Sequence, residues 1–242
     1  MMTDIAIELR KYAGTRGGRA VLVVTGALTV LLGVVGALVA DGDPLLVSRA
    51  VSYPMTLLEI GLPIIVVLLF TAEWSARDAV QTFLLRPRRA VVLRSKCLAA
   101  AVVLLAGLAL GAGTSLLAVG VRSLVTETPV SLRGLGGADG ALTRSVLTTL
   151  LYGAFAVGVG LLVARTAIGL VVYLGAISLL ETMLALGLGE RSVWLSLSQA
   201  VGRISSVDVQ AADLPSLATA MSLWIVLPLL LGSFAFLRRE AR

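Results

Sequence analysis

Residues 71–96, TAEWSARDAVQTFLLRPRRAVVLRSK, separate two long apolar runs of this 242-residue chain. The stretch begins with Glu73 and Trp74 and becomes rich in arginine toward Lys96. The flanking runs, about 51–72 and 97–121, are each long enough to be a membrane helix, which needs about 20 residues to cross a ~30 Å hydrocarbon layer. We therefore expect the stretch to connect two membrane spans.

The composition extends this expectation to the whole chain. Hydrophobic residues make up 58 % of the sequence and the mean hydropathy is +0.99, which is more apolar surface than a soluble domain of this length can bury. We expect an all-α integral membrane protein in the lipid bilayer, with one transmembrane domain over residues 1–242. The six predicted spans are about 20–40, 51–72, 97–121, 143–164, 166–188 and 216–237.

Two segments need a specific interpretation. The apolar stretch 143–188 would be ~70 Å long as one helix, more than twice the hydrocarbon thickness, so we expect a hairpin that turns at Arg165 and Thr166. At the N-terminus, Ile5, Leu9 and Tyr12 share one face at helical spacing, which favours an interfacial helix on the inner leaflet. A solvated basic leader is the alternative.

The basic residues predict the orientation of the chain. Segments that lie in the cytosol when the N-terminus is inside contain Arg10, Lys11, Arg16, Arg19, Arg77, Arg86, Arg88, Arg89, Arg94, Lys96, Arg165, Arg238, Arg239 and Arg242. The opposite loops contain Arg49, Arg122, Arg133, Arg144, Arg191 and Arg203. Because positive charge favours the cytosolic side, both ends of the chain are predicted to lie inside.

Several kinds of chemistry are excluded by the residue types. Cys97 is the single cysteine and the chain contains no histidine, which excludes internal disulfides, Cys/His metal sites and histidine acid–base catalysis. The net charge of +6 does not indicate nucleic-acid binding, because no basic patch is interleaved with base-stacking aromatic residues. We expect neither an enzyme nor a partner made of nucleic acid.

Within the basic stretch, Ala76, Val80, Phe83 and Leu84 fall on one face of a helix that Pro87 would end. This pattern predicts a short amphipathic helix on the cytosolic side. An ordinary positive loop whose helix lies against lipid headgroups fits the same pattern, so the residues alone leave both interpretations open.

The order of motifs in this region resembles ABC type-2 transporter permeases. Their signature is similar to Glu73-Trp74, followed by a short helix, the run Leu84-Leu-Arg-Pro-Arg-Arg89 and a lysine, here Lys96, that opens the third span. Outside 73–96 the resemblance is mainly compositional. One difference is Ser75-Ala-Arg-Asp78, where family members often have Arg-x-Gly-Thr after the Glu-Trp.

The resemblance implies that the short helix couples the chain to a groove of a separate ATPase subunit. The implied coupling residues are Glu73, Trp74, Arg77, Asp78, Val80, Phe83, Leu84, Arg86, Pro87 and Arg88. It also implies an assembly of two ATPase chains and two permease chains, the second permease being identical or homologous. The sequence has no Gly-x-x-x-x-Gly-Lys-Ser/Thr phosphate loop, so ATP and Mg²⁺ are expected on the partner and no cofactor on this chain.

Two acids lie inside predicted spans. Glu59 and Glu181 are each ~20 Å from the cytosolic end of their span, counted at 1.5 Å per residue. A charge at this depth costs on the order of 3 kcal/mol, so each is expected to face protein or water. In the resembling family these two spans border the transport path, which would let the acids bind a cationic group; hydrogen bonding to a neighbouring helix is the alternative.

These observations lead to a functional hypothesis. We expect the permease subunit of an ATP-driven exporter for a small amphipathic compound such as an antibiotic, a drug or an antimicrobial peptide. A membrane scaffold or regulator that binds an ATPase without transporting is the alternative. The excess of arginine over lysine is typical of a GC-rich bacterial genome. The predicted location is the bacterial cytoplasmic membrane.

Overall fold

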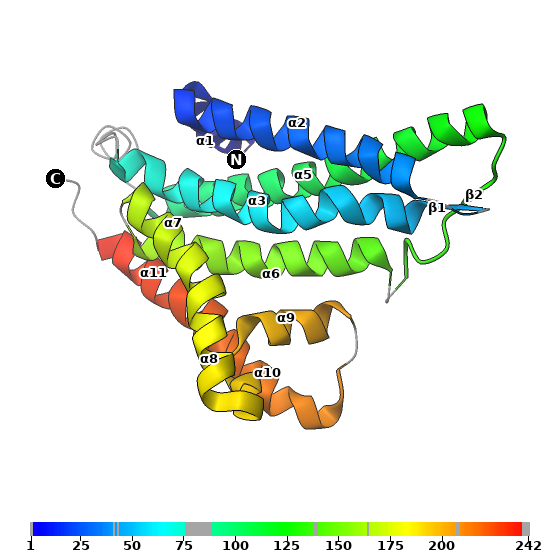
Figure 1. Cartoon of the computed structure of the whole chain (residues 1–242). Coiled ribbons are helices and arrows are strands. Elements are labelled where there is room, and N and C mark those ends of the chain that lie inside the picture. Colours follow the sequence, from blue (N-terminus) through cyan, green and yellow to red (C-terminus); the bar gives the residue numbers. More distant parts are fainter. Residues whose placement is uncertain are drawn as a thin grey trace.

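The computed structural model describes residues 2–40, 42, 44–75, 89–137, 140–163, 165–206 and 209–238 (Figure 1). Within these residues, six helical segments are long and apolar enough to cross a membrane. They are Arg16–Val39, Val47–Ala72, Arg89–Thr126, Ala141–Leu162, Thr166–Trp194 and Ala211–Arg238. The prediction of an all-α membrane protein is therefore confirmed in its general form.

The chain begins with two helices joined by a tight turn. Helix α1, Met2–Gly14, is followed at once by α2, Arg16–Val39. The hydroxyl of Thr15 caps α2 by accepting a hydrogen bond from the N–H of Gly18 over 3.0 Å. A side chain at Gly18 would lie 2.2 Å from the carbonyl oxygen of Tyr12, so this turn needs glycine. The turn lets α1 fold back against α2 and α5.

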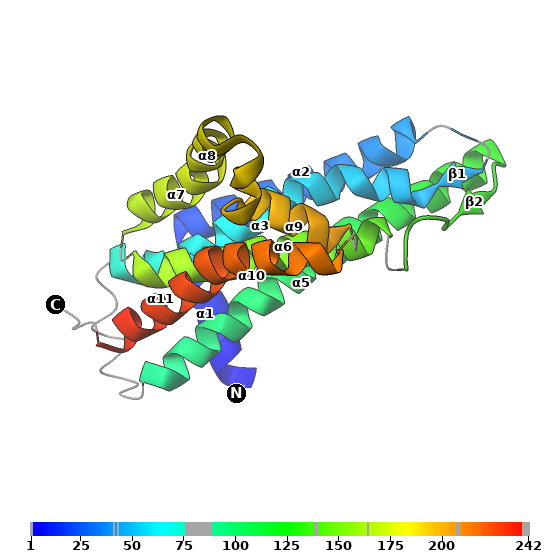
Figure 2. The same ribbon diagram turned by 90° about the horizontal axis from the view of Figure 1, so that it is seen from below.

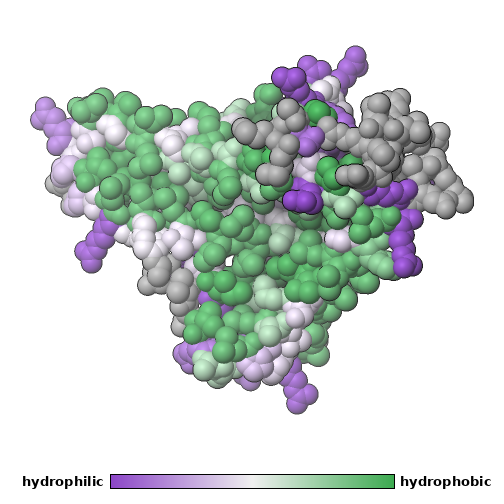
Figure 3. Space-filling view, turned by 180° about the vertical axis from the view of Figure 1, so that it is seen from behind, coloured by the Kyte–Doolittle hydropathy of each residue, from purple (hydrophilic) through white to green (hydrophobic). Residues whose placement is uncertain are grey.

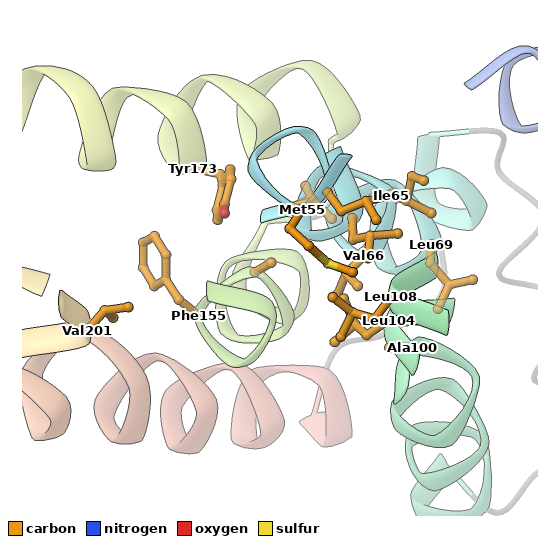
Figure 4. Packing of buried hydrophobic residues seen from close by; sticks show 14 of the residues in the cluster. Met55, Ile65, Val66, Leu69, Ala100, Leu104, Leu108, Phe155, Tyr173 and Val201 are labelled. Atoms are coloured by element: carbon orange, nitrogen blue, oxygen red, sulfur yellow. The ribbon is translucent and has the colours of Figure 1, made fainter. Parts of the chain in front are cut away.

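Helix α3, Val47–Ser75, is the centre of the bundle and packs against α2, α5, α6 and α7. Figure 4 shows its side chains Met55, Ile65 and Val66 facing the cluster that includes Leu104 and Leu108. These neighbours cover α3 along most of its length.

Helix α5, Arg89–Thr126, is longer at both ends than the predicted span 97–121. Its small residues Gly107 and Gly111 face Leu62 and Leu58 of α3, whose methyl groups would lie 2.5 Å and 2.7 Å from an added side chain. This glycine pair therefore mediates close packing within the chain.

At one end of the bundle the connections are more ordered than the sequence indicates. Strands β1, Leu45–Leu46, and β2, Val130–Ser131, form a short parallel pair next to the far end of α5. Arg122 donates hydrogen bonds to the carbonyls of Ala37 and Ala40, over 2.6 Å and 3.0 Å, and so caps the end of α2. We call this the sheet end of the bundle.

The predicted hairpin in 143–188 has its break where expected. Helix α6, Ala141–Leu162, ends just before Arg165, and α7, Thr166–Gly175, begins directly after it. The fifth span continues through a π-helical segment, Ala176–Leu180, into α8, Glu181–Leu188, and a 3₁₀ turn, Gly189–Trp194.

The last part of the chain folds back beside α6 (Figure 2). Helix α9, Leu197–Ser205, lies between the fifth and sixth spans. The sixth span comprises a 3₁₀ turn, Ala211–Asp213, then α10, Leu214–Met221, a π-helical segment, Ser222–Val226, and α11, Leu227–Arg238. Both of the last two spans thus contain a π-helical interruption, a feature that is frequent at functional sites.

The outer surface of the helices is apolar. Figure 3 shows hydrophobic residues over most of one face, with hydrophilic residues mainly toward its edges. Large side chains such as Leu117, Val171, Met183 and Leu186 are largely exposed on α5, α7 and α8. Continuous apolar surface of this kind indicates contact with lipid or with other membrane helices.

Candidate functional site

Most of the predicted coupling residues lie outside the described residues. These are Arg77, Asp78, Val80, Phe83, Leu84, Arg86, Pro87 and Arg88. Glu73 and Trp74 lie in the last turn of α3, and only their backbone is described. For this region the structure therefore describes only the two helix ends that flank it, at Ser75 and Arg89.

Next to these helix ends is a buried charged cluster. The carboxylate of Glu8 on α1 lies 2.9 Å from the ammonium of Lys96 on α5, and 3.2 Å from that of Lys11. The Lys96 ammonium also donates to the carbonyl of Leu69 on α3 over 3.5 Å. The side chains of Lys96 and Glu8 are only 2 % and 3 % exposed. Lys96 thus connects α1, α3 and α5 at one end of the bundle.

Tyr12 extends this contact along α1. Its side chain is buried, and burial raises the pKa of its phenol from 10.0 to about 12. Its hydroxyl has no hydrogen-bond partner among the described residues. The face of Ile5, Leu9 and Tyr12 therefore packs against protein, mainly α2 and α5. Whether α1 also lies at a membrane surface stays a prediction.

The pairing of Glu8 with Lys96 was not predicted from the sequence, although Lys96 belongs to the motif that carries the resemblance. One signal was present: on a helix, Glu8 lies on the same face as Ile5 and Tyr12. An acid on the apolar face of an amphipathic helix needs a buried partner, and Lys96 supplies it.

A second polar feature lies on α3 toward the sheet end. Arg49, Ser52, Tyr53 and Thr56 are exposed and follow one face at spacings of three and four residues, and Glu59 continues it one turn deeper. We call these five residues the α3 polar stripe. Its described neighbours leave this part of the central helix partly uncovered, together with the apolar Ile60.

Two pockets open along the α3 polar stripe, with volumes of about 390 Å³ and 340 Å³. Ser52 and Thr56 line both of them. The first lies beside the end of α2, and the second reaches Glu59 and the first turns of α6, where Arg144 and Ser145 face it. Ser145 is hydrogen-bonded to the Glu59 carboxylate. The pocket at Glu59 therefore combines a carboxylate, hydroxyl groups and a guanidinium.

Glu181 lies in a different environment. Its side chain is 8 % exposed and accepts hydrogen bonds at the N-terminus of α9. The hydroxyl of Ser196 donates to one carboxylate oxygen over 2.7 Å, and the N–H of Ser198 to the other over 3.0 Å. The Leu197 N–H and the Ser198 hydroxyl also donate. The negative charge of the carboxylate thus lies at the N-terminus of α9, where it interacts favourably with the positive end of the helix dipole.

The same junction is tied to the sixth span. The indole N–H of Trp224, within the second π-helical segment, donates to the carbonyl of Leu195 over 2.6 Å. Glu181 directly follows the first π-helical segment. Residues 195–198 are consequently held by both irregular spans.

The structure does not bring Glu59 and Glu181 together in one site. They lie on different helices, α3 and α8. Glu59 faces an open pocket, whereas the carboxylate of Glu181 accepts hydrogen bonds from residues 196–198 of the same chain.

Comparison with protein-family models gives no match for this sequence, and a search of curated proteins finds no similar one.

Proposed function

We propose that this chain is the permease subunit of an ATP-driven exporter in a bacterial cytoplasmic membrane, powered by separate ATPase subunits. The substrate class is a small amphipathic compound such as an antibiotic, drug or antimicrobial peptide. In the proposed topology both ends of the chain and residues 76–88 lie in the cytosol. The sheet end then faces outward.

The observation that carries this proposal is the α3 polar stripe. Arg49, Ser52 and Thr56 are exposed on the central helix of an apolar bundle, and Glu59 opens into a pocket beside them. Of these residues Glu59 lies inside the predicted span 51–72, and a carboxylate at membrane depth is costly against lipid, so it indicates water, a substrate or another polar surface. A transport path supplies such surroundings, whereas a scaffold does not require them.

The buried cluster at Lys96 supports a mechanical role for the opposite end. Lys96 joins α1, α3 and α5 through contacts with Glu8 and Leu69. Arg89, at the start of α5, donates to the carbonyl of Leu237 near the end of α11 over 3.3 Å. In the proposed mechanism an ATPase pushes on residues 76–88, and these contacts spread the displacement to four helices. The spans then alternate between inward and outward opening.

Purification tests the partner. A tagged chain is expected to co-purify with an ATPase, and reversing the charges of Arg77 and Arg86 to glutamate should abolish that association. Arg133→Glu is the matched control, because Arg133 is exposed at the sheet end. Failure to recover any ATPase, under conditions that keep the chain folded, would contradict the proposal.

Flux in proteoliposomes separates the exporter from the scaffold. With the co-purified ATPase, ATP should drive uptake of ethidium, a cationic amphiphile, into vesicles whose ATPase side faces out. Glu59→Gln should lower this uptake and ethidium-stimulated ATP hydrolysis while leaving the assembly intact. ATP hydrolysis without flux of any tested amphiphile would favour the scaffold.

A further inference from the structure

The pocket of about 340 Å³ at Glu59 contains groups of opposite charge. Glu59 lies on α3, whereas Arg144 lies on the first turn of α6, directly before the Ser145 that hydrogen-bonds the carboxylate. Hydroxyl groups of Ser52 and Thr56 line the same space. The volume falls within the range of small-ligand pockets, about 300–1,000 Å³.

The carboxylate of Glu59 retains capacity to accept hydrogen bonds. No ion pair among the described residues includes Glu59. A carboxylate has about four acceptor positions, of which Ser145 occupies one. An ammonium group, with three N–H donors and a positive charge, is the complementary ligand.

Arg144 supplies the complement for an anionic group. Its side chain is exposed, and it follows the start of α6 at Ala141 by three residues, so it lies nearer the helix end than Ser145. Guanidinium groups bind phosphate and carboxylate with paired N–H donors. A ligand that placed its ammonium at Glu59 would therefore carry its anionic group toward the mouth of the pocket.

We infer that the pocket between α3 and α6 binds a zwitterionic group, with Glu59 holding a primary ammonium and Arg144 holding a neighbouring phosphate or carboxylate. This inference names a substrate class and rests on the proposed function, because the pocket faces outward only in the proposed topology. Phosphoethanolamine has this chemistry. It can come from a phospholipid headgroup or from a soluble amphiphile.

Titration calorimetry of the purified chain in detergent tests the site without ATPase or ATP. The probes are dihexanoyl phosphatidylethanolamine, O-phosphoethanolamine and dihexanoyl phosphatidylcholine, whose methylated nitrogen has no N–H donor. The ethanolamine lipid should bind at least tenfold more tightly than the choline lipid. If O-phosphoethanolamine binds as tightly as the ethanolamine lipid, the ligand is a soluble compound. If it binds more weakly than that lipid, the ligand is a lipid.

Two variants assign the binding to the pocket. Glu59→Gln and Arg144→Gln should each weaken binding of the ethanolamine lipid at least tenfold. Glu127→Gln and Arg133→Gln, exposed residues near the sheet end outside the pocket, should change it less than twofold. If Glu59→Gln fails to fold, Arg144→Gln still decides, because the Arg144 side chain is exposed.

Three results would overturn the inference. The first is equal affinity for the ethanolamine and choline lipids, and the second is unchanged affinity in both Glu59→Gln and Arg144→Gln. The third is that these variants change the oligomeric state of the chain and leave its lipid affinity unchanged. The last result would show that a second copy of the chain covers the α3 polar stripe. If the chain binds the ethanolamine lipid but recruits no ATPase, the ligand site is supported and the exporter function is contradicted. If ATP drives flux but the chain binds neither probe, the exporter function is supported and the ligand site is contradicted.

Discussion

The carboxylate of Glu8 and the ammonium of Lys96 form a buried ion pair, with Oε2 and Nζ 2.9 Å apart. It joins the first helix of the chain to the helix that follows residues 76–88. Removing one partner of a buried pair leaves an uncompensated charge and costs more than the pair itself contributes. The contact therefore makes α1 part of the bundle instead of an independent leader.

Lys96→Met should lower the free energy of unfolding by on the order of 3 kcal/mol, because Lys11 would be the one remaining ion-pair partner of the buried Glu8 among the described residues. Lys11→Met is the matched control and should cost less than about 1 kcal/mol, since the Lys11 side chain is 38 % exposed. Thermal and denaturant melting in detergent would measure both. Equal effects of the two variants would contradict a special role for Lys96.

Tyr12 makes the docking of α1 sensitive to high pH. Because burial raises its pKa from 10.0 to about 12, the folded chain keeps this proton where the unfolded chain loses it. Stability from Tyr12 is therefore full below pH 10 and falls between about pH 10 and pH 12. Melting temperatures measured across this range should fall more steeply for the wild type than for Tyr12→Phe.

Tyr12→Phe also removes a buried hydroxyl that has no partner among the described residues, so it should raise the free energy of unfolding by up to about 1 kcal/mol at neutral pH. Tyr53→Phe is the control, because Tyr53 is 38 % exposed on the α3 polar stripe. A steep alkaline transition that persists in Tyr12→Phe would assign it to another group.

Glu181→Gln should loosen α9 because an amide has one acceptor oxygen where the carboxylate has two, and it carries no charge to oppose the helix dipole. Backbone amides of residues 197–205 should exchange hydrogen faster, at least tenfold at the N-terminal turn. Glu190→Gln, an exposed acid in the 3₁₀ turn after α8, should leave this exchange unchanged. Unaltered exchange in Glu181→Gln would show that the hydrogen bonds to residues 196–198 do not hold α9.

Features that depend on neighbouring residues could be predicted from the sequence, whereas features that depend on contacts between distant segments could not. Apolar run length is a local property, and it located all six long helical segments and the break at Arg165. The early start of α5 at Arg89 was missed because charged residues near Lys96 were read as connection, although lysine and arginine are good helix formers. The β1–β2 pair joins distant segments and has no local signal.

The same reasoning applies to the two acids. Depth along the span predicted that both need polar surroundings, and both have them. Spacing along one helix could not show which neighbour would provide them. Ser145 lies far from Glu59 in sequence, and the donors to Glu181 lie on a separate helix. Distinguishing an open pocket from a closed hydrogen-bond network required the packing of α3, α6 and α9.

Gly158→Ala tests how closely α6 and α11 must pack. A methyl group at Gly158 would lie 2.7 Å from Cβ of Pro228 and 3.1 Å from the backbone nitrogen of Leu229, neither of which can rotate away. Overpacking of this kind costs about 1–3 kcal/mol, and a cost in that range should lower the melting temperature in detergent.

Gly113→Ala on α5 is the control, since nothing lies within 4 Å of a methyl group there. Because alanine is the better helix former, the control should be neutral or slightly stabilising. If the two variants melted at the same temperature, the close approach of α6 and α11 at Gly158 would be wrong.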